Sequence, residues 1–144
     1  MKICNMKDLE KALQPVMLGM VDELAERVYE TLNYFLQEYY NSYDPKSYRR
    51  QYDFLRSAVK VEPKMQGNKV TASVYIDIDY MDNYYNATGY QVASWANRGL
   101  HGGLDTGGNT PHVWDDTMKS TVENGELLKL AIDYLKSKGF SVRN

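Results

Sequence analysis

The 144-residue chain has one cysteine, two histidines and three phenylalanines, and it lacks any long apolar run. A single cysteine, Cys4, excludes an internal disulfide, and we interpret it as an incidental thiol near the N-terminus. No apolar stretch is long enough to cross a bilayer, and the first residues lack the apolar core of a secretory signal. We therefore expect synthesis and folding in the cytoplasm, without a membrane partner.

An excess of basic charge is also missing, because 17 Lys and Arg residues face 19 Asp and Glu residues, for a net charge of -2. Nucleic acid binding depends on clustered basic side chains that neutralise phosphates, so only a local patch could support it. The densest such patch lies within residues 46–60 and consists of Lys46, Arg49, Arg50, Arg56 and Lys60, interleaved with Tyr48 and Tyr52. We favour a subunit interface for this patch, with nucleic acid binding as the alternative.

Tyrosine is abundant, with 13 tyrosines against three phenylalanines. A ring with a polar tip suits surfaces that are half buried, as in contacts between subunits. The interface that we predict consists of Tyr43, Tyr48, Arg49, Arg50, Tyr52, Arg56, Trp95 and Arg98.

Apolar side chains recur at steps of three and four from residue 7 to residue 40, which predicts a long helix. Pro15 either begins the main part of this helix or kinks it. Turn-forming residues at 41–45 end the helix, and the same period predicts a short helix over residues 47–57.

The period then changes to two, which predicts a β-hairpin over residues 58–79 with a turn at 66–68. In its first strand, Val59, Val61 and Pro63 are expected to face the core, alternating with Lys60 and Glu62. The strongest alternation in the chain is in the second strand, from residue 70 to residue 78.

Residues 80–112 are rich in glycine and predict a long loop, in which Tyr90 to Trp95 could form a third strand. The helical period returns over residues 115–138, where Asp115 or Asp116 can cap the helix and Gly125 can kink or break it. The expected fold is therefore a single α+β domain over residues 1–144. Its long N-terminal helix and its C-terminal helix pack on one face of a small antiparallel sheet.

Two groups of side chains are candidates for a catalytic or metal site. The first combines His101 and His112 with Asp105, Asp115 and Asp116, but its spacing fits no helical ligand pair and it occupies a glycine-rich loop. We interpret it as a solvated loop. A metal-dependent enzyme is therefore a weaker hypothesis than a protein that acts through subunit contacts or one that binds nucleic acid.

The second group, Asp77, Asp79, Asp82 and Asn83, is similar to the start of a calcium loop. Its twelfth position is Thr88 instead of glutamate, so solvent-facing strand carboxylates explain it better. We expect no metal, no cofactor and no catalytic residue, and hence no enzyme.

The segment from Tyr43 to Val59 resembles the family of siphophage tail-completion or neck proteins, which are also labelled minor tail components. Members have the pattern Pro-x-x-Tyr-x-Arg-Thr-Gly-x-Leu-x-x-Ser directly before the first strand. The residues that match it are Pro45, Tyr48, Arg50 and Ser57, and Leu55 stands one position after the leucine of the pattern. Gln51 to Asp53 depart from it, because threonine and glycine are usual there. Residues 91–99 and 111–114 are loosely similar to later family motifs.

This resemblance implies a structural, non-catalytic protein of a bacteriophage or prophage that acts at the head–tail junction. It implies that the chain assembles with itself as a ring-type homo-oligomer and with neighbouring neck or tail proteins. Its location would be the host cytoplasm during assembly and then the virion.

Overall fold

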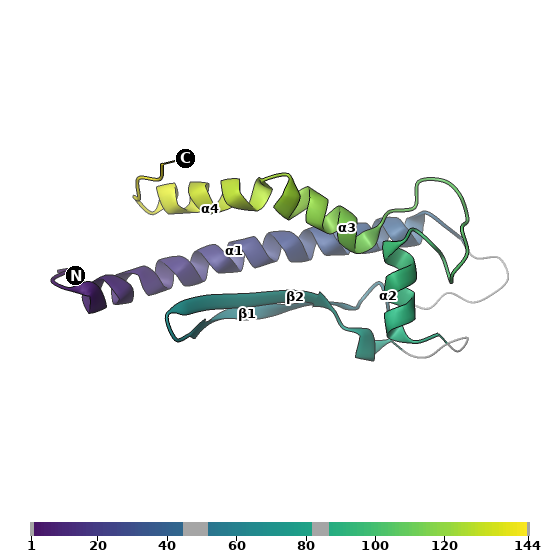
Figure 1. Ribbon diagram of the computed structural model, residues 1–144, viewed down its shortest axis with the longest axis horizontal. Coiled ribbons are helices and arrows are strands. Elements are labelled where there is room, and N and C mark those ends of the chain that lie inside the picture. Colours follow the sequence, from purple (N-terminus) through teal and green to yellow (C-terminus); the bar gives the residue numbers. More distant parts are fainter. Residues whose placement is uncertain (1, 45–51, 82–86, 144) are drawn as a thin grey trace.

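A computed structural model describes residues 2–44, 52–81 and 87–143 (Figure 1). Its elements are helix α1 (Met6–Asn41), strands β1 (Ala58–Gln66) and β2 (Lys69–Ile76), the 3-10 turn η1 (Ile78–Tyr80), helices α2 (Gly89–Asn97) and α3 (Val113–Met118), the π-helical segment η2 (Lys119–Glu123) and helix α4 (Glu126–Ser137). The two strands form an antiparallel sheet with a helix packed against it, which confirms the α+β class.

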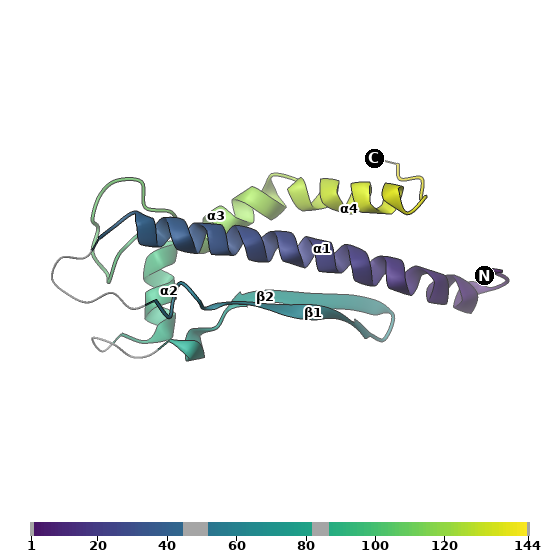
Figure 2. The ribbon, with the colours of Figure 1, turned by 180° about the vertical axis from the view of Figure 1, so that it is seen from behind.

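Helix α1 is the central rod of the molecule. The hairpin lies along one side of it, and α3 and α4 lie along the opposite side (Figures 1 and 2). The C-terminal helix was expected on the sheet, but it packs against α1 instead. A two-stranded sheet is about 5 Å from strand to strand and a helix is about 10 Å wide, so α1 alone covers the inner face of the sheet.

The predicted long helix is confirmed and is continuous, with Pro15 inside it. Asn5 caps its start, because the Asn5 side chain accepts a hydrogen bond from the Asp8 backbone N–H at 3.0 Å. At its end, the Ser42 N–H donates to the carbonyl of Glu38 at 3.0 Å. The helix runs along most of the long axis of the fold (Figure 2).

The hairpin is confirmed, but the expected facing of its first strand is wrong. Lys60 is paired with Val74, and the Lys60 side chain, which is 11% exposed, reaches α1. Val61 therefore lies on the outer face, where it is 37% exposed. Carboxylates on α1 bind the Lys60 ammonium, so Lys60 faces inward and its neighbour Val61 faces outward. The predicted strand also ends before Ile78, which belongs to η1.

The third strand expected from Tyr90 to Trp95 is also wrong, because these residues form helix α2. A capping box begins this helix: the Thr88 hydroxyl accepts from the Gln91 N–H at 3.2 Å, and the Gln91 side chain accepts from the Thr88 N–H at 2.9 Å. These two bonds satisfy the backbone N–H groups of Thr88 and Gln91 within the helix start. In a strand, the same groups would need a neighbouring strand as their partner.

The short helix expected over residues 47–57 is not present in its described part. Residues 52–57 form turns, in which the Arg56 N–H donates to the carbonyls of Tyr52 and Asp53, both at 3.2 Å. Residues 47–51 lie outside the described part of the chain.

The predicted break at Gly125 is confirmed, since this residue adopts the left-handed conformation with φ 79° between η2 and α4. The C-terminal helical region begins at Val113. In its first turn, the Asp116 side chain accepts a hydrogen bond from the His112 N–H at 2.8 Å. The Asn97 side chain, which belongs to α2, accepts a hydrogen bond from the Asp115 N–H at 2.8 Å and so caps the start of α3.

The hydrophobic core lies near the C-terminal end of α1. Its buried residues are Leu32, Leu36, Tyr39, Tyr40, Phe54, Ala58, Met81, Ala96 and Val113. Towards the N-terminus of α1 the apolar side chains are only partly covered, and α4 has no fully buried residue. The half of the molecule that holds α4 and the hairpin tip is thus incompletely packed.

Candidate interaction surface

Five of the eight predicted interface residues fall in the described part of the chain: Tyr43, Tyr52, Arg56, Trp95 and Arg98. The other three, Tyr48, Arg49 and Arg50, lie outside the described residues, as does Lys46.

Tyr43 and Tyr52 lie near the C-terminal end of α1. The Tyr52 ring is stacked on Tyr40, with ring centroids 5.7 Å apart, and remains 47% exposed. Tyr43 is half-buried, and its ring is 4.9 Å from that of His101. Arg56 is exposed four residues after Tyr52. This arrangement gives rings that are fixed on one side and open on the other.

Trp95 and Arg98 belong to α2 and its C-terminal end. Trp95 is half-buried under the glycine-rich loop, where a methyl group on Gly103 would lie 3.5 Å from the Trp95 ring. Arg98 is exposed. Trp95 is therefore partly engaged in holding the loop, whereas Arg98 is available to a partner.

His101 holds the same loop onto the core. Its ring is buried and stacks on Tyr39, with centroids 4.3 Å apart and planes inclined by 16°. Its Nε2 lies 3.0 Å from the Ser42 hydroxyl. The second histidine, His112, is exposed, and its Nδ1 lies 3.0 Å from the Asn97 carbonyl. Within residues 2–44, 52–81 and 87–143, no group of three His, Cys, Asp or Glu side chains could hold a metal ion.

Lys60 does not belong to an accessible basic patch. Its Nζ donates to Asp22 at 2.7 Å and to Glu26 at 2.9 Å, both on α1. These hydrogen bonds, the one to Asp22 first, raise the pKa of Lys60 above its ordinary value of 10.5. The same contact lowers the pKa of the Asp22 carboxyl from its ordinary 3.8. An ammonium bound by two carboxylates has little affinity left for phosphate, which weakens the nucleic acid alternative.

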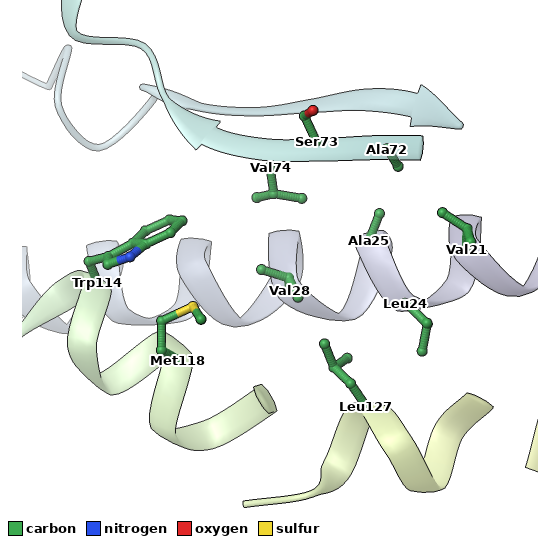
Figure 3. Close-up of a pocket in the computed structure, with 10 residues that line it drawn as sticks. All are labelled: Val21, Leu24, Ala25, Val28, Ala72, Ser73, Val74, Trp114, Met118 and Leu127. Carbon is green, nitrogen blue, oxygen red and sulfur yellow. The ribbon is translucent and has the colours of Figure 1, made fainter. Parts of the chain in front are cut away.

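An open apolar groove runs beside α1, and Figure 3 shows its lining side chains. Helix α1 forms its floor, β2 forms one wall, and α3 and α4 form the other (Figure 3). Its volume is about 300 Å³. The lining residues are Val21, Leu24, Ala25, Val28, Ala72, Ser73, Val74, Trp114, Met118 and Leu127. Nine of these ten side chains are apolar, so the groove suits another apolar surface better than a charged ligand.

The sequence did not predict this groove. Its lining comes from three parts of the chain that lie far apart, and the helical period marks such side chains as core-facing whether or not another element covers them. One indirect signal was available, because α1 and α4 together carry more apolar positions than one hairpin can cover.

The rim of the groove is the free edge of β2. Among the described residues, no main-chain hydrogen bond joins β2 to any element other than β1. β2 has no proline and one charged residue, Lys69, whereas β1 contains Pro63 and an irregularity between Val61 and Lys64. The two edges of this sheet are therefore not equivalent, because proline and bulges impede further pairing at an edge.

Among the described residues, no helix is long and apolar enough to cross a bilayer.

A family model named YomN matches residues 5–137. No curated protein and no solved structure matches the chain significantly. The match covers most of the chain, so the chain belongs to the YomN family, whose name is that of a phage-derived protein, and it is a phage-associated protein.

Proposed function

We propose that the protein is a structural, non-catalytic component of a phage or prophage particle that acts at the head–tail junction. It assembles with copies of itself, as a ring-type oligomer, and with neighbouring neck or tail proteins. It folds in the host cytoplasm and ends in the virion. The observation that carries this proposal is the open apolar groove between β2, α1 and the α3–α4 wall.

In the single chain, the apolar side chains of the groove remain partly exposed to water. Burying a large aliphatic side chain contributes about 1.5–3 kcal/mol, and several half-exposed side chains of this kind line the groove. Aromatic and methionine side chains, such as Trp114 and Met118, are enriched in protein–protein interfaces. A partner that covers this groove therefore gains free energy that the isolated chain cannot gain.

Two further observations support the proposal that the protein acts through contacts with other proteins. The tyrosine and arginine surface around Tyr52 and Arg56 lies near the C-terminal end of α1, away from the hairpin tip, so the rod offers contact surfaces at separate places along its length. Membership of a phage-associated family supports the phage origin that the resemblance in the sequence implies.

The direct test is to purify particles made by the phage or prophage that encodes the chain and to analyse them by quantitative mass spectrometry. We expect the protein in intact particles at a few copies relative to the major capsid protein. Deletion of its gene should yield separate heads and tails in electron micrographs. Normal joined particles from the deletion strain, or particles without the protein, would contradict the proposal.

A matched pair of variants tests the groove itself. Val28→Asp places a charge in the groove, whereas Tyr34→Asp places the same charge on an exposed part of α1, where Tyr34 is 59% exposed. We expect Val28→Asp to fold and yet fail to complement the deletion, and Tyr34→Asp to complement it. Equal complementation by both variants would argue against the groove as the contact.

A further inference from the structure

The hydrogen-bonding pattern of the hairpin shows which backbone groups point away from it. The Asp77 N–H donates to the Ser57 carbonyl at 2.7 Å, which places Asp77 at a hydrogen-bonded position. Because these positions alternate along an antiparallel pair, Tyr75 and Ser73 also direct their backbone groups to β1. The backbone groups of Val74 and Ala72 therefore point out at the free edge, above the groove.

Apart from Lys69 at its start, this edge has no proline, bulge or charged side chain to impede pairing with another chain. β2 has eight residues with the sequence KVTASVYI, and a β-branched or aromatic residue stands at most positions. The opposite edge has Pro63, which lacks an N–H, in its irregular stretch. Extension of the sheet is thus favoured beside β2 and impeded beside β1.

The charges at the two ends of this edge are complementary to each other. Lys69 is exposed at the start of β2, and Asp77 is half-buried directly after its end. Asp77 uses its Oδ1 to accept from the Asp79 and Tyr80 N–H groups, at 3.1 and 3.3 Å, and its Oδ2 has no hydrogen-bond partner among the described residues. A second β2 running antiparallel brings the lysine end of one copy to the aspartate end of the other.

We propose that two copies of the chain pair antiparallel along β2, with Ser73 opposite Ser73 of the second copy, to form a four-stranded sheet. This proposal rests on the self-assembly in the proposed function and specifies its first contact. In this register, the outward backbone groups of Ala72 meet those of Val74 of the second copy. Lys69 then lies opposite Asp77 of the second copy, at both ends of the contact.

The pairing also covers the groove. Opposite residues in a sheet place their side chains on the same face, and Val74 points from β2 towards α1 (Figure 3). Ala72 and Val74 of the second copy therefore face the groove from above. A contact of this kind uses the same surface on both copies and closes at two, so a larger ring needs a second surface, such as the one around Tyr52 and Arg56.

Disulfide trapping tests the register. In a Cys4→Ser background, Ser73→Cys places two cysteines opposite each other at a position without direct hydrogen bonds, where Cα atoms are about 4.5 Å apart and a disulfide can form. Val61→Cys is the matched control, because Val61 is paired with Ser73 on the same outer face but belongs to β1. We expect a covalent dimer from Ser73→Cys alone upon mild oxidation. No dimer, or equal dimer from both variants, overturns the proposal.

Charge exchange tests the contact independently of oxidation. Lys69→Glu and Asp77→Lys each replace attraction by repulsion at both ends, so each should weaken the dimer about tenfold. An equimolar mixture of the two variants restores attraction at both ends and should form heterodimers, seen by native mass spectrometry. Circular dichroism of each variant verifies folding, since Asp77→Lys also removes the cap of η1.

Parent protein that remains monomeric at high micromolar concentration, or a mixture that shows no preference for heterodimers, would overturn the pairing. These outcomes are distinguishable from failure of the proposed function. A monomer that is still present in virions defeats only the β2 contact. A dimer that is missing from virions defeats the role in the particle.

Discussion

Lys60 Nζ lies 2.7 Å from Asp22 Oδ1, and this contact joins strand β1 to the central helix. Glu26, one helical turn further along α1, accepts from the same ammonium at 2.9 Å. The two carboxylates are about half exposed, whereas the Lys60 side chain is 11% exposed. The lysine stem therefore fills space under the sheet while its charge is held by the helix.

Substitution of Lys60 separates the two parts of this role. Lys60→Met keeps the apolar stem and removes the charge, so it should lower the midpoint of thermal unfolding; Lys60→Ala should lower it further because the stem is lost as well. Lys64→Met, on an exposed lysine of the same strand, is the control. Circular dichroism melts provide the measurement, and identical midpoints for Lys60→Met and Lys64→Met would contradict the role.

The same contact predicts how stability depends on pH. The hydrogen bond from Lys60 lowers the pKa of Asp22 below its ordinary 3.8, so its contribution is complete above pH 3.8 and is lost as the pH falls through the lower folded value. The raised pKa of Lys60 makes its contribution complete below pH 10.5, and this contribution is lost as the pH rises through the higher folded value. Asp22→Asn should therefore melt below the parent at neutral pH, with a difference that shrinks in strong acid. A pH-independent difference would refute this linkage.

The long helix and the hairpin could be predicted because their periods extend over many residues. The facing of β1 could not, because it depends on Asp22 and Glu26, which precede Lys60 by more than thirty residues. Helix α2 could have been recognised from Thr88 and Gln91, whose three-residue spacing is that of a capping box. The stretch from Tyr90 to Trp95 was expected as a possible strand, but the capping box begins a helix there.

The predicted interface remains a prediction, and two of its residues, Tyr52 and Arg56, are accessible. Lys60, which the sequence placed in the basic patch of residues 46–60, is engaged with α1. The groove escaped prediction because periodicity identifies apolar faces without showing which of them another element covers. Val28, for example, follows the helical period of α1 and yet lines an open space.

Two helical glycines provide a matched pair for close packing. A methyl group on Gly89 would collide with the backbone carbonyl of Ile78, whereas one on Gly19 would collide with the hydroxyl end of the Tyr134 side chain. The Ile78 carbonyl cannot move without shifting η1, whereas the Tyr134 side chain can change its rotamer. We therefore expect Gly89→Ala to cost about 1–3 kcal/mol of unfolding free energy in urea titrations, and Gly19→Ala to cost less. The reverse order would show that η1 adapts more readily than α4.

His101 is expected to stabilise the loop instead of performing chemistry. His101→Phe retains stacking on Tyr39 and loses the contact with Ser42, and His101→Ala loses both. We predict a loss of about 1 kcal/mol for the first variant and about 3 kcal/mol for the second. Hydrogen exchange should show faster exchange at Leu104, whose N–H donates to the His101 carbonyl at 3.0 Å. Unchanged stability in both variants would indicate that the loop is held by other contacts.

Tryptophan fluorescence can distinguish which surface an assembly uses, because the chain has two tryptophans, Trp95 and Trp114. Trp114 lines the groove, and Trp95 belongs to the predicted tyrosine and arginine interface. In the Trp95→Phe variant, association through the groove should shift the Trp114 emission to shorter wavelength and reduce its quenching by acrylamide, since water leaves the ring. Adding Val28→Asp should abolish that shift. In the Trp114→Phe variant, a shift from Trp95 alone would assign the association to the tyrosine and arginine surface near the C-terminal end of α1.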